Sequence, residues 1–409
     1  MKSDLIRGNA VIGQSGGPTA VINQSLAGVI LALREKLVET GTVKTIYGMR
    51  HGVNGLVSGD VIDLTTYAKK KLEIIAQTPS AALGSSRDKP DADYCLKILA
   101  SCKKLQARYF FYIGGNDSSD TCRIVNDLAV KNHYDLRCFH VPKTVDNDLV
   151  GSDHTPGYPS AARFLALAFM SDSMDNASLP GVKINVVMGR HAGFLTAASA
   201  LARGTGKDAG RNGPHLIYVP EVNFDPKKFL KQVEAVYSKL GRCQIAVSEG
   251  VQDSAGRPIA TTLATNLDKD MHGNVQLSGV SVLGDSLADL VKKNLKVAGG
   301  KSVRVRADTF GYLQRCWPDP SPVDSKEARQ AGKFAVKCAA KGLRSGSVAI
   351  TREEGKKYKS ALQLLKLEDV AAKTRHMPRE FIDANSQVTK AFLDYVTPLV
   401  GSLPIMARL

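Results

Sequence analysis

The sequence lacks the features of a secreted or membrane-spanning chain. Its seven cysteines are an odd number without a Cys-x-x-Cys pair, which argues against a disulfide framework and a zinc site. No stretch of about 18 apolar residues is present, and the first residues hold charges in place of an apolar signal core. We therefore expect a chain in the reducing cytoplasm, with no membrane as a partner.

Aromatic residues are also scarce, at 6% of the chain with a single tryptophan, while Lys and Arg outnumber Asp and Glu by 55 to 39. This excess is compatible with nucleic acid, an anionic surface or small anionic ligands. The basic runs Lys69–Lys71 and Lys292–Lys293 have no interleaved aromatic residues on which bases could stack. We interpret them as solvated faces and expect no nucleic-acid partner.

Six short apolar runs each lead directly into glycine or a functional polar residue. They are Ala10–Ile12, Tyr109–Ile113, Cys138–Val141, Ile184–Met188, Leu216–Val219 and Ile245–Val247. Such runs are typical of strands buried on both faces, and the segments between them have helical spacing, as in 19–37, 118–131 and 160–174. The alternation predicts an α/β fold with mostly parallel, doubly wound sheets, whose ligands bind beyond the carboxyl ends of the strands.

The same alternation occurs in the first ~150 residues and in the next ~150, which predicts two similar lobes. We place one lobe at residues 1–155 plus about 315–375, and the other at 156–314 plus about 376–409. Three prolines predict a loop over 318–325, and the pattern of 325–343 predicts a helix.

The first of the polar segments, Gly13-Gln14-Ser15-Gly16-Gly17-Pro18-Thr19, is a glycine-rich turn that runs into a helix N-terminus. Unpaired amide groups and the helix dipole favour an anion at such a place. The spacing of the glycines fits neither the Walker nor the Rossmann motif. The segment alone is weak evidence for phosphate binding.

The segment Pro142–Asp148 places a lysine, a threonine and two aspartates within seven residues at a predicted strand end. A carboxylate there can accept a proton from an attacking hydroxyl, while the lysine stabilises a transferring group. Two carboxylates can also bind Mg²⁺, partly through water. The alternative is an Asx-type turn beside a solvated lysine.

This segment resembles the Pro-Lys-Thr-x-Asp-Asn-Asp signature of pyrophosphate-dependent phosphofructokinases, whose ATP-dependent relatives usually have glycine in place of the lysine. Further matching segments follow in the same order over residues 9–315: Gly16-Gly17 with Asn23, 48–56, 84–87, 114–118, 157–161, 188–190, 249–250 and 306–315. The resemblance implies two similar α/β lobes, an active site in the cleft between them, a Mg²⁺ cofactor and a homodimer or homotetramer.

The resemblance also implies three catalytic residues. Asp146 would be the general base that takes the proton from the 1-hydroxyl of fructose 6-phosphate. Lys143 would stabilise the transferring phosphoryl group and the leaving phosphate, and Arg190 would contact the sugar and that group.

The implied binding residues divide between the two substrates. The sugar-phosphate residues would be Thr144, Asp148, Met188, Gly189, Glu249, Arg306, Tyr312 and Arg315, with Tyr312 and Arg315 on the 6-phosphate and Arg306 reaching it from a neighbouring subunit. The donor residues would be Gly16, Gly17, Arg87, Asn116, Asp117 and Ser118, with Asp117 and Asn116 as metal ligands. Without the resemblance, Arg87, Arg306 and Arg315 would be interpreted as surface arginines, Glu249 as a helix N-terminal charge and Tyr312 as a core aromatic.

Asp117 and Lys143 together favour pyrophosphate over ATP as the donor. A carboxylate ~4 Å from an additional phosphate oxygen would cost about 4 kcal/mol at an effective dielectric constant near 20. The sequence departs from the family pattern at Asn116, where an acidic residue is common, at Thr19-Ala20-Val21, and at Tyr312, where many ATP-using members have histidine.

The expected reaction is reversible transfer from pyrophosphate to fructose 6-phosphate, which gives fructose 1,6-bisphosphate and phosphate and belongs to glycolysis and gluconeogenesis. Two alternatives stay open. One is an ATP-dependent sugar-phosphate kinase, and the other is a catalytically silent regulatory subunit that binds sugar phosphate.

Overall fold

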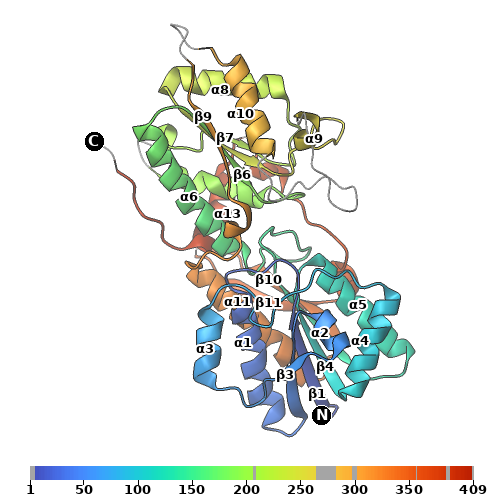
Figure 1. Cartoon of the computed structure of the whole chain (residues 1–409). Helices are drawn as coiled ribbons and strands as arrows, with labels where there is room; N and C mark the ends of the chain where they lie inside the picture. The colour runs from blue at the N-terminus through green and yellow to red at the C-terminus, as the bar shows by residue number, and fades with distance from the viewer. Residues whose placement is uncertain are drawn as a thin grey trace. The chain divides into compact units, whose positions relative to one another are not determined.

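The computed structural model describes residues 5–205, 209–263, 282–296, 302–355, 357–383 and 387–407. The chain divides into two compact units, which Figure 1 shows with their elements labelled. Unit 1 comprises 1–160 and 315–375, and unit 2 comprises 161–314 and 376–409. The roles of the two units as donor lobe and sugar-phosphate lobe stay a prediction.

Unit 1 contains a seven-stranded sheet in the order β11-β10-β5-β4-β1-β2-β3. Its strands are β1 (Gly8–Gln14), β2 (Val43–Met49), β3 (Val61–Asp63), β4 (Ala107–Gly114), β5 (Arg137–Pro142), β10 (Ser345–Arg352) and β11 (Ser360–Leu365). The five central strands are parallel, and β3 and β11 pair antiparallel at the two edges. The predicted parallel α/β architecture is confirmed, and the antiparallel edges were not foreseen.

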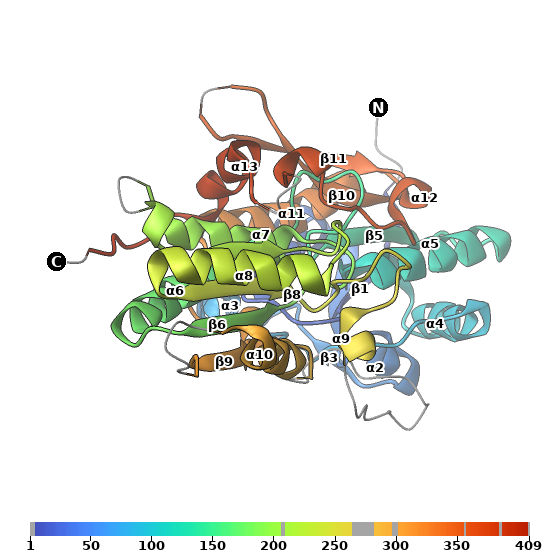
Figure 2. The ribbon, with the colours of Figure 1, turned by 90° about the horizontal axis from the view of Figure 1, so that it is seen from above.

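The helices of unit 1 cover both faces of this sheet (Figure 1). One face packs against α1 (Ile22–Leu33), the π-helical turn η1 (Arg34–Val38), α3 (Lys69–Gln77) and α11 (Pro322–Ala340). The other packs against α2 (Val53–Ser58), α4 (Ala92–Lys104), α5 (Asn116–Lys131) and α12 (Leu367–Val370). Figure 2 shows α4 and α5 lying side by side.

Helix α11 corrects the predicted loop over 318–325, because the helix already begins at Pro322. Proline is tolerated at the first helical position, where its missing N–H would have no partner in the helix. The hydroxyl of Ser321 accepts hydrogen bonds from the backbone N–H groups of Val323 and Asp324 and so caps the helix. The prolines therefore mark a helix start as well as a loop.

Helices α1 and α11 pack unusually closely through two glycines. A Cβ atom on Gly28 would lie 2.3 Å from the carbonyl oxygen of Arg329, and one on Gly332 would lie 2.3 Å from that of Ser25. Both obstacles are backbone atoms of the facing helix. Only glycine at these positions allows the two helices to approach so closely.

Unit 2 contains a four-stranded, fully parallel sheet in the order β7-β8-β6-β9. Its strands are β6 (Val182–Val187), β7 (Leu216–Tyr218), β8 (Cys243–Ser248) and β9 (Val305–Thr309). Its helices are α6 (Tyr158–Ser178), which starts in unit 1, α7 (Phe194–Ala198), α8 (Pro226–Leu240), α9 (Ile259–Leu263), α10 (Val282–Asn294) and α13 (Lys390–Val400). Short 3₁₀ turns lie at η2 (Ser199–Arg203), η3 (Ala209–Arg211), η4 (Gly311–Gln314) and η5 (Arg379–Phe381).

The core of unit 2 is built around its four-stranded sheet. Apolar side chains of all four strands pack with those of α8, α9 and α10 in one cluster. Among the described residues, no helix is long and apolar enough to cross a lipid bilayer.

Candidate active site

The strand order of unit 1 places a topological switch point between β1 and β4. From β1 the chain passes to β2 on one side, and it returns to β4 on the other side. Loops diverge at such a point and leave a crevice beyond the carboxyl ends of the strands. The glycine-rich segment follows β1, Asn116 follows β4, and Lys143 follows β5. Three of the segments that hold predicted site residues therefore meet at one edge of one sheet.

A buried polar network fixes the glycine-rich segment against residues 80–87. The Gln14 amide donates to Asn23 Oδ1 at 2.9 Å, and Gln14 Oε1 accepts from the Leu83 backbone N–H at 2.9 Å. Gly16 N–H donates to the Ser86 carbonyl at 2.8 Å, and the Ser85 hydroxyl donates to the Gly16 carbonyl at 2.6 Å. Sequence reasoning missed Gln14 as a positioning residue. The available signal was an amide close behind the apolar run Ala10–Ile12, and the structure buries it fully.

Lys143 is buried, with 3% of its surface exposed, and its ammonium donates a hydrogen bond to the Gly17 carbonyl at 2.8 Å. Burial, followed by the charge of the Arg315 guanidinium, lowers the pKa of Lys143 to about 8, although Asp146 and Asp148 act in the opposite direction. The solvated lysine of the alternative interpretation is therefore wrong. The lysine points back into the glycine-rich segment.

The two glycines leave room for cationic side chains that lie against this segment. A Cβ atom on Gly16, whose φ is +74°, would lie 3.0 Å from Lys143 Nζ. One on Gly17 would lie 2.8 Å from Cζ of Arg315. Two cationic side chains therefore lie directly over two glycines, within the range of each other's charge. Such like-charge crowding favours a multiply charged anion as the ligand.

The loop after β5 is ordered by its own side chains. Thr144 Oγ1 accepts a hydrogen bond from the Asp146 backbone N–H at 3.1 Å. Asn147 has a φ of +60° and is fully buried, and its Oδ1 accepts from the Thr155 backbone N–H at 3.0 Å. Asparagine tolerates this left-handed conformation better than most residues. The turn therefore sets the backbone positions of Asp146 and Asp148 on either side of Asn147.

His140 is a buried support that sequence reasoning missed. Its Nε2 lies 2.8 Å from the Gly114 carbonyl and its Nδ1 lies 2.8 Å from Ser347 Oγ. Burial lowers the pKa of His140 to about 4, so the ring is neutral near pH 7. Because a carbonyl can only accept, Nε2 carries the proton and Nδ1 accepts from the serine. The ring thus ties β5 to the end of β4, directly before the predicted donor loop at 114–118.

Asn116 and Asp148 join the donor loop to the loop after β5. Asn116 Nδ2 donates to Asp148 Oδ2 at 2.9 Å. Asn116 Oδ1 is buried and has no hydrogen-bond partner within the described ranges. A buried amide oxygen without a partner is costly unless a ligand or a water satisfies it.

Asp117 lies in the first turn of α5, and its Oδ1 is 3.3 Å from Lys89 Nζ. Both side chains are mostly exposed. Sequence reasoning did not foresee Lys89, and the pairing reduces the electrostatic penalty that an unpaired Asp117 would impose on an additional phosphate. Ser118 is buried at the same helix start, where a Cβ atom on Gly114 would lie only 2.0 Å from its hydroxyl.

The predicted metal ligands fit a Mg²⁺ ion that keeps most of its water. Within the part of the chain that the structure describes, no three His, Cys, Asp or Glu side chains gather to hold a metal. The available ligands are the Asp117 carboxylate and the unsatisfied Oδ1 of Asn116. Mg²⁺ is commonly bound by one or two protein oxygens together with substrate phosphates and water.

In unit 2, Gly189 and Gly250 bring two predicted sugar-site segments into backbone contact. A Cβ atom on Gly250 would lie 2.0 Å from the Arg190 carbonyl oxygen. Ser248 Oγ donates to the Gly189 carbonyl at 2.7 Å. Arg190 Nε lies 3.9 Å from Glu249 Oε1, so the two predicted side chains lie near each other.

The remaining residues of the predicted sugar site in unit 2 differ in their exposure. Met188 is buried, and its backbone N–H donates to Gln314 Oε1 at 3.1 Å. Arg306 is exposed on β9, and Tyr312 is half exposed in η4, so Tyr312 is not a core aromatic. Sequence reasoning did not single out Gln314, which is buried and links η4 to the end of β6.

The structure therefore gathers the predicted residues into two sets. In unit 1 the set comprises Gly16, Gly17, Arg87, Asn116, Asp117, Ser118, Lys143, Thr144, Asp146, Asp148 and Arg315. In unit 2 it comprises Met188, Gly189, Arg190, Glu249, Arg306 and Tyr312. Every predicted residue lies after a strand of a parallel sheet or in a segment packed near such a strand end, apart from Arg306, which lies within β9.

Comparison with known proteins shows that the chain belongs to the phosphofructokinase family, whose model matches residues 9–339. It is 52% identical to pyrophosphate–fructose 6-phosphate 1-phosphotransferase of Rhodospirillum rubrum, over 97% of this chain and 95% of the relative. It is 37% identical to the protein of that name from Halomonas elongata, over 96% and 91%. The crystal structure of pyrophosphate-dependent phosphofructokinase from Marinobacter aquaeolei matches with a TM-score of 0.83 and 32% identity, over 98% of this chain and 94% of that one.

Membership of this family makes the chain a phosphotransferase, as the motifs had predicted. The predicted similarity to pyrophosphate-dependent members is confirmed, because the relatives at 52% and 37% identity have that activity in their names. The role of each individual site residue stays a prediction.

Proposed function

We propose that the protein transfers a phosphoryl group reversibly from pyrophosphate to the 1-hydroxyl of fructose 6-phosphate, which forms fructose 1,6-bisphosphate and phosphate. The observation that carries this proposal is the buried ammonium of Lys143 on the Gly17 carbonyl, with the Arg315 guanidinium close by. Folding brings these two cations close together in unit 1, which costs free energy because like charges repel each other. A bound diphosphate, as an anion, would offset this cost.

Lys143 and Arg315 would neutralise the charge that spreads over the phosphate oxygens during transfer. Phosphoryl transfer needs little covalent help, so positioning and electrostatic stabilisation account for most of the catalysis. The backbone of Gly16 and Gly17 lets the phosphates approach closely, and Arg87 would reach the donor from the adjoining loop. This assignment is supported by the hydrogen bonds that tie residues 80–87 to the glycine-rich segment.

Asp146 would act as the general base that accepts the proton of the 1-hydroxyl. Its backbone is held by Thr144, and its carboxylate lies close enough to Lys143 to influence the pKa of that lysine. A nearby ammonium keeps a carboxylate ionised and therefore able to accept a proton. Asp148, which accepts the Asn116 amide, would hold the donor loop in register with the base.

Mg²⁺ would be held by Asp117 and Asn116, and when bound it neutralises charge on the phosphate oxygens of the donor. The unsatisfied Oδ1 of Asn116 supports this assignment, since it offers a preformed oxygen ligand. The ion would keep several waters, because these two residues fill only part of an octahedral shell.

In unit 2, Arg190 and Glu249 would bind the sugar, and Tyr312 would join Arg315 on the 6-phosphate. The exposed side chain of Arg306 supports a role across a subunit boundary in a homodimer or homotetramer. A mixture of inactive Arg306→Ala and Asp146→Asn proteins tests this role, because hybrid oligomers regain activity only if Arg306 acts on the neighbouring subunit's site.

A donor exchange on the purified protein tests the main proposal. We expect turnover with pyrophosphate and fructose 6-phosphate, and little or none with ATP. Turnover with ATP alone would establish the sugar-phosphate kinase instead. Binding of fructose 6-phosphate without turnover on either donor would establish the silent regulatory subunit.

The proposed base is tested separately by Asp146→Asn, with Asp127→Asn on the surface of α5 as the matched control. We expect the Asp146 variant to lose about 10²- to 10⁴-fold in turnover while it still binds fructose 6-phosphate. The control should behave as the wild type, because an exposed ion pair contributes little. Full activity of the Asp146 variant would exclude this residue as the base.

A further inference from the structure

The loop directly after the proposed base is held by an arginine from the end of unit 1. This loop comprises residues 148–153 and leads from the turn around Asp146 to His154. The arginine is Arg375, which lies beyond residues 9–339, the part of the chain that the family model matches. Arg375 is therefore not among the residues by which the family is recognised.

Arg375 binds the backbone of this loop at both of its ends. The backbone N–H of Arg375 donates to the Asp148 carbonyl at 2.8 Å. Its side-chain Nη1 donates to the carbonyls of Ser152 and Asp153, at 2.7 and 2.5 Å. One residue from a distant part of the chain therefore contacts the first residue of the loop and its last two.

The guanidinium of Arg375 suits such a loop. Residues 148–153 lie outside any helix or strand, so their carbonyls lack the partners that secondary structure would supply. Arg375 is half-buried, and hydrogen bonds from a charged donor are stronger than those between neutral groups. An antiparallel bridge between Thr374 and Leu149 adds a further attachment. The contact is therefore specific to the backbone of this loop.

The turn that precedes the loop needs support from two sides. Asn147 has a φ of +60°, a conformation that is costly for residues other than glycine and persists only where the surroundings hold it. On one side, the Thr155 N–H donates to Asn147 Oδ1 at 3.0 Å, and the Thr155 hydroxyl donates to the Thr144 carbonyl at 2.9 Å. On the other side, Arg375 holds the Asp148 carbonyl. The proposed base lies within this turn.

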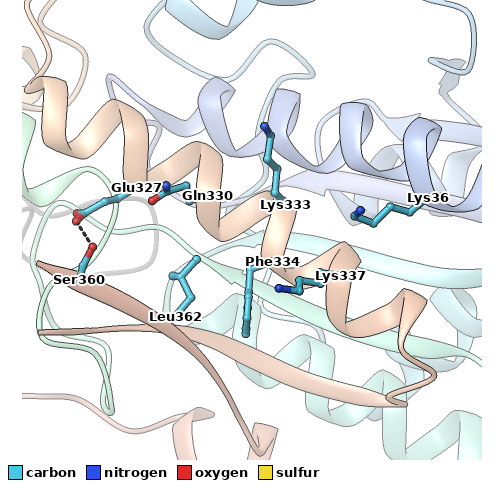
Figure 3. Close-up of a pocket in the computed structure, with 8 residues that line it drawn as sticks. All are labelled: Lys36, Glu327, Gln330, Lys333, Phe334, Lys337, Ser360 and Leu362. Carbon is cyan, nitrogen blue, oxygen red and sulfur yellow. Dashed lines mark hydrogen bonds between the residues drawn. The ribbon is translucent and has the colours of Figure 1, made fainter. Parts of the chain in front are cut away.

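A buried network anchors the residue after the loop through side chains other than Arg375. His154 is buried, with Nδ1 2.8 Å from Asp153 Oδ2 and Nε2 2.6 Å from Glu327 Oε2. Burial opposes the charged ring, but hydrogen bonds to the two carboxylates outweigh burial and raise the pKa of His154 to about 9. Glu327 also accepts from Ser360 Oγ at 2.6 Å, as Figure 3 shows. His154 is thereby tied to α11.

We propose that Arg375 is a positioning residue for the phosphoryl transfer, which acts through the backbone of residues 148–153 on the placement of Asp146. The inference rests on the proposed role of Asp146 as the base. Because His154 and Thr155 are anchored separately, Arg375 sets the course of the backbone between them and the turn. A displacement of about 1 Å at a reacting group can cost about 10²-fold in rate, so Arg375 affects turnover without any contact with a substrate.

The turnover of Arg375→Met with pyrophosphate and fructose 6-phosphate tests this role. We expect kcat to fall about 10- to 100-fold, while KM for both substrates stays within about twofold of the wild type. Arg375→Lys should recover part of the lost turnover, because its ammonium can still donate to a carbonyl. The matched control is Arg344→Met, which removes an exposed arginine directly before β10 and should behave as the wild type.

A double variant distinguishes positioning of the base from general damage to the fold. Asp146→Asn has already lost the base, so adding Arg375→Met should reduce its turnover by less than about twofold. A residue that only stabilises the fold would reduce turnover by the same factor on both backgrounds. Hydrogen exchange gives a second measurement: amides of 147–155 should exchange faster in Arg375→Met, while those of β4 and β5 stay protected.

Three results would overturn the proposal. These are full turnover of Arg375→Met, an equal factor of loss on the wild-type and Asp146→Asn backgrounds, and a rise in KM alone, which would indicate direct binding of a substrate by Arg375. Full turnover of Asp146→Asn would overturn the proposed base and this inference together. Full turnover of Arg375→Met beside an inactive Asp146→Asn would overturn this inference alone.

Discussion

Replacing Lys143 with methionine is expected to stabilise the fold while it abolishes activity. The ordinary pKa of lysine is 10.5, and burial, followed by the Arg315 charge, lowers that of Lys143 to about 8. This lowering of the pKa corresponds to roughly 3 kcal/mol of unfavourable free energy for the charged form in the folded state. Methionine has a similar length and carries no charge, so it removes this cost.

The loss of one hydrogen bond opposes this stabilisation. The Gly17 carbonyl accepts the Lys143 ammonium at 2.8 Å and loses this partner in the variant. The loss costs about 1 kcal/mol, so the expected net stabilisation at pH 7 is about 2 kcal/mol. For a unit of roughly 200 residues this equals an increase in Tm of about 4–8 °C.

The stability advantage of Lys143→Met should change with pH in a definite direction. The folded-state pKa of Lys143 lies below its unfolded value, so below about pH 8 the lysine is charged in both states and the folded wild type bears the full penalty. Between about pH 8 and 10.5 the folded state releases the proton, and the penalty disappears. The advantage of Lys143→Met should therefore be greatest at pH 7 and fall as the pH rises toward 10.

Urea unfolding at several pH values measures this difference, with Lys131→Met on the exposed end of α5 as the control for adding methionine. The assay of pyrophosphate-dependent turnover runs in parallel. A Lys143 variant that is less stable than the wild type at pH 7, or an advantage that grows with pH, would refute the reasoning. Stabilisation with activity retained would leave the electrostatics intact but remove Lys143 from catalysis.

Three further outcomes follow from the structure. Gly17→Ala should displace only the flexible Arg315 side chain, so its stability should stay within about 1 kcal/mol of the wild type while turnover falls, whereas Gly28→Ala meets the backbone of Arg329 and should cost about 1–3 kcal/mol in urea unfolding. His154→Asn should destabilise the fold by about 3–5 kcal/mol below pH 6.5. The folded-state pKa of His154 is raised to about 9, so the difference in unfolding free energy between the variant and the wild type should shrink between pH 6.5 and 9 in unfolding experiments. Asp324→Ala should cost about 3 kcal/mol, since it leaves the N–H groups of Gly157 and Ser160 at the start of α6 without their acceptor, and an unchanged unfolding midpoint would contradict this role.

The fold was largely predictable because strands β1, β4, β5, β6, β7 and β8 each contain a continuous apolar run that leads into a glycine or a functional polar residue. Tyr109–Ile113 and Cys138–Val141 lie inside strands β4 and β5 of the structure. Strands buried on both faces give such runs directly, whatever lies elsewhere in the chain. The short edge strands β3 and β11 are only half-buried, and their weak pattern left them undetected.

The start of α11 was missed for a different reason. Prolines were interpreted as loop residues, but Pro322 occupies the first position of a helix that Ser321 caps. A serine directly before a proline and a run of helix-forming residues was the available signal. The local sequence was sufficient to predict where this helix begins, but the serine and the proline were interpreted as loop residues.

The site was predictable only as a set of segments, because its decisive contacts join residues far apart in the chain. The motif at 142–148 indicates a lysine near a base, but not that its ammonium turns back to Gly17. Likewise, Asp117 seemed to face the donor as an unpaired charge, and only the folded chain brings Lys89 within 3.3 Å of it. The expected preference for pyrophosphate over ATP then depends less on the charge of Asp117 than on the size of its side chain and on the buried Lys143. The stability of Lys143→Met is therefore the sharper measure of how far this site is adapted to a small, highly charged donor.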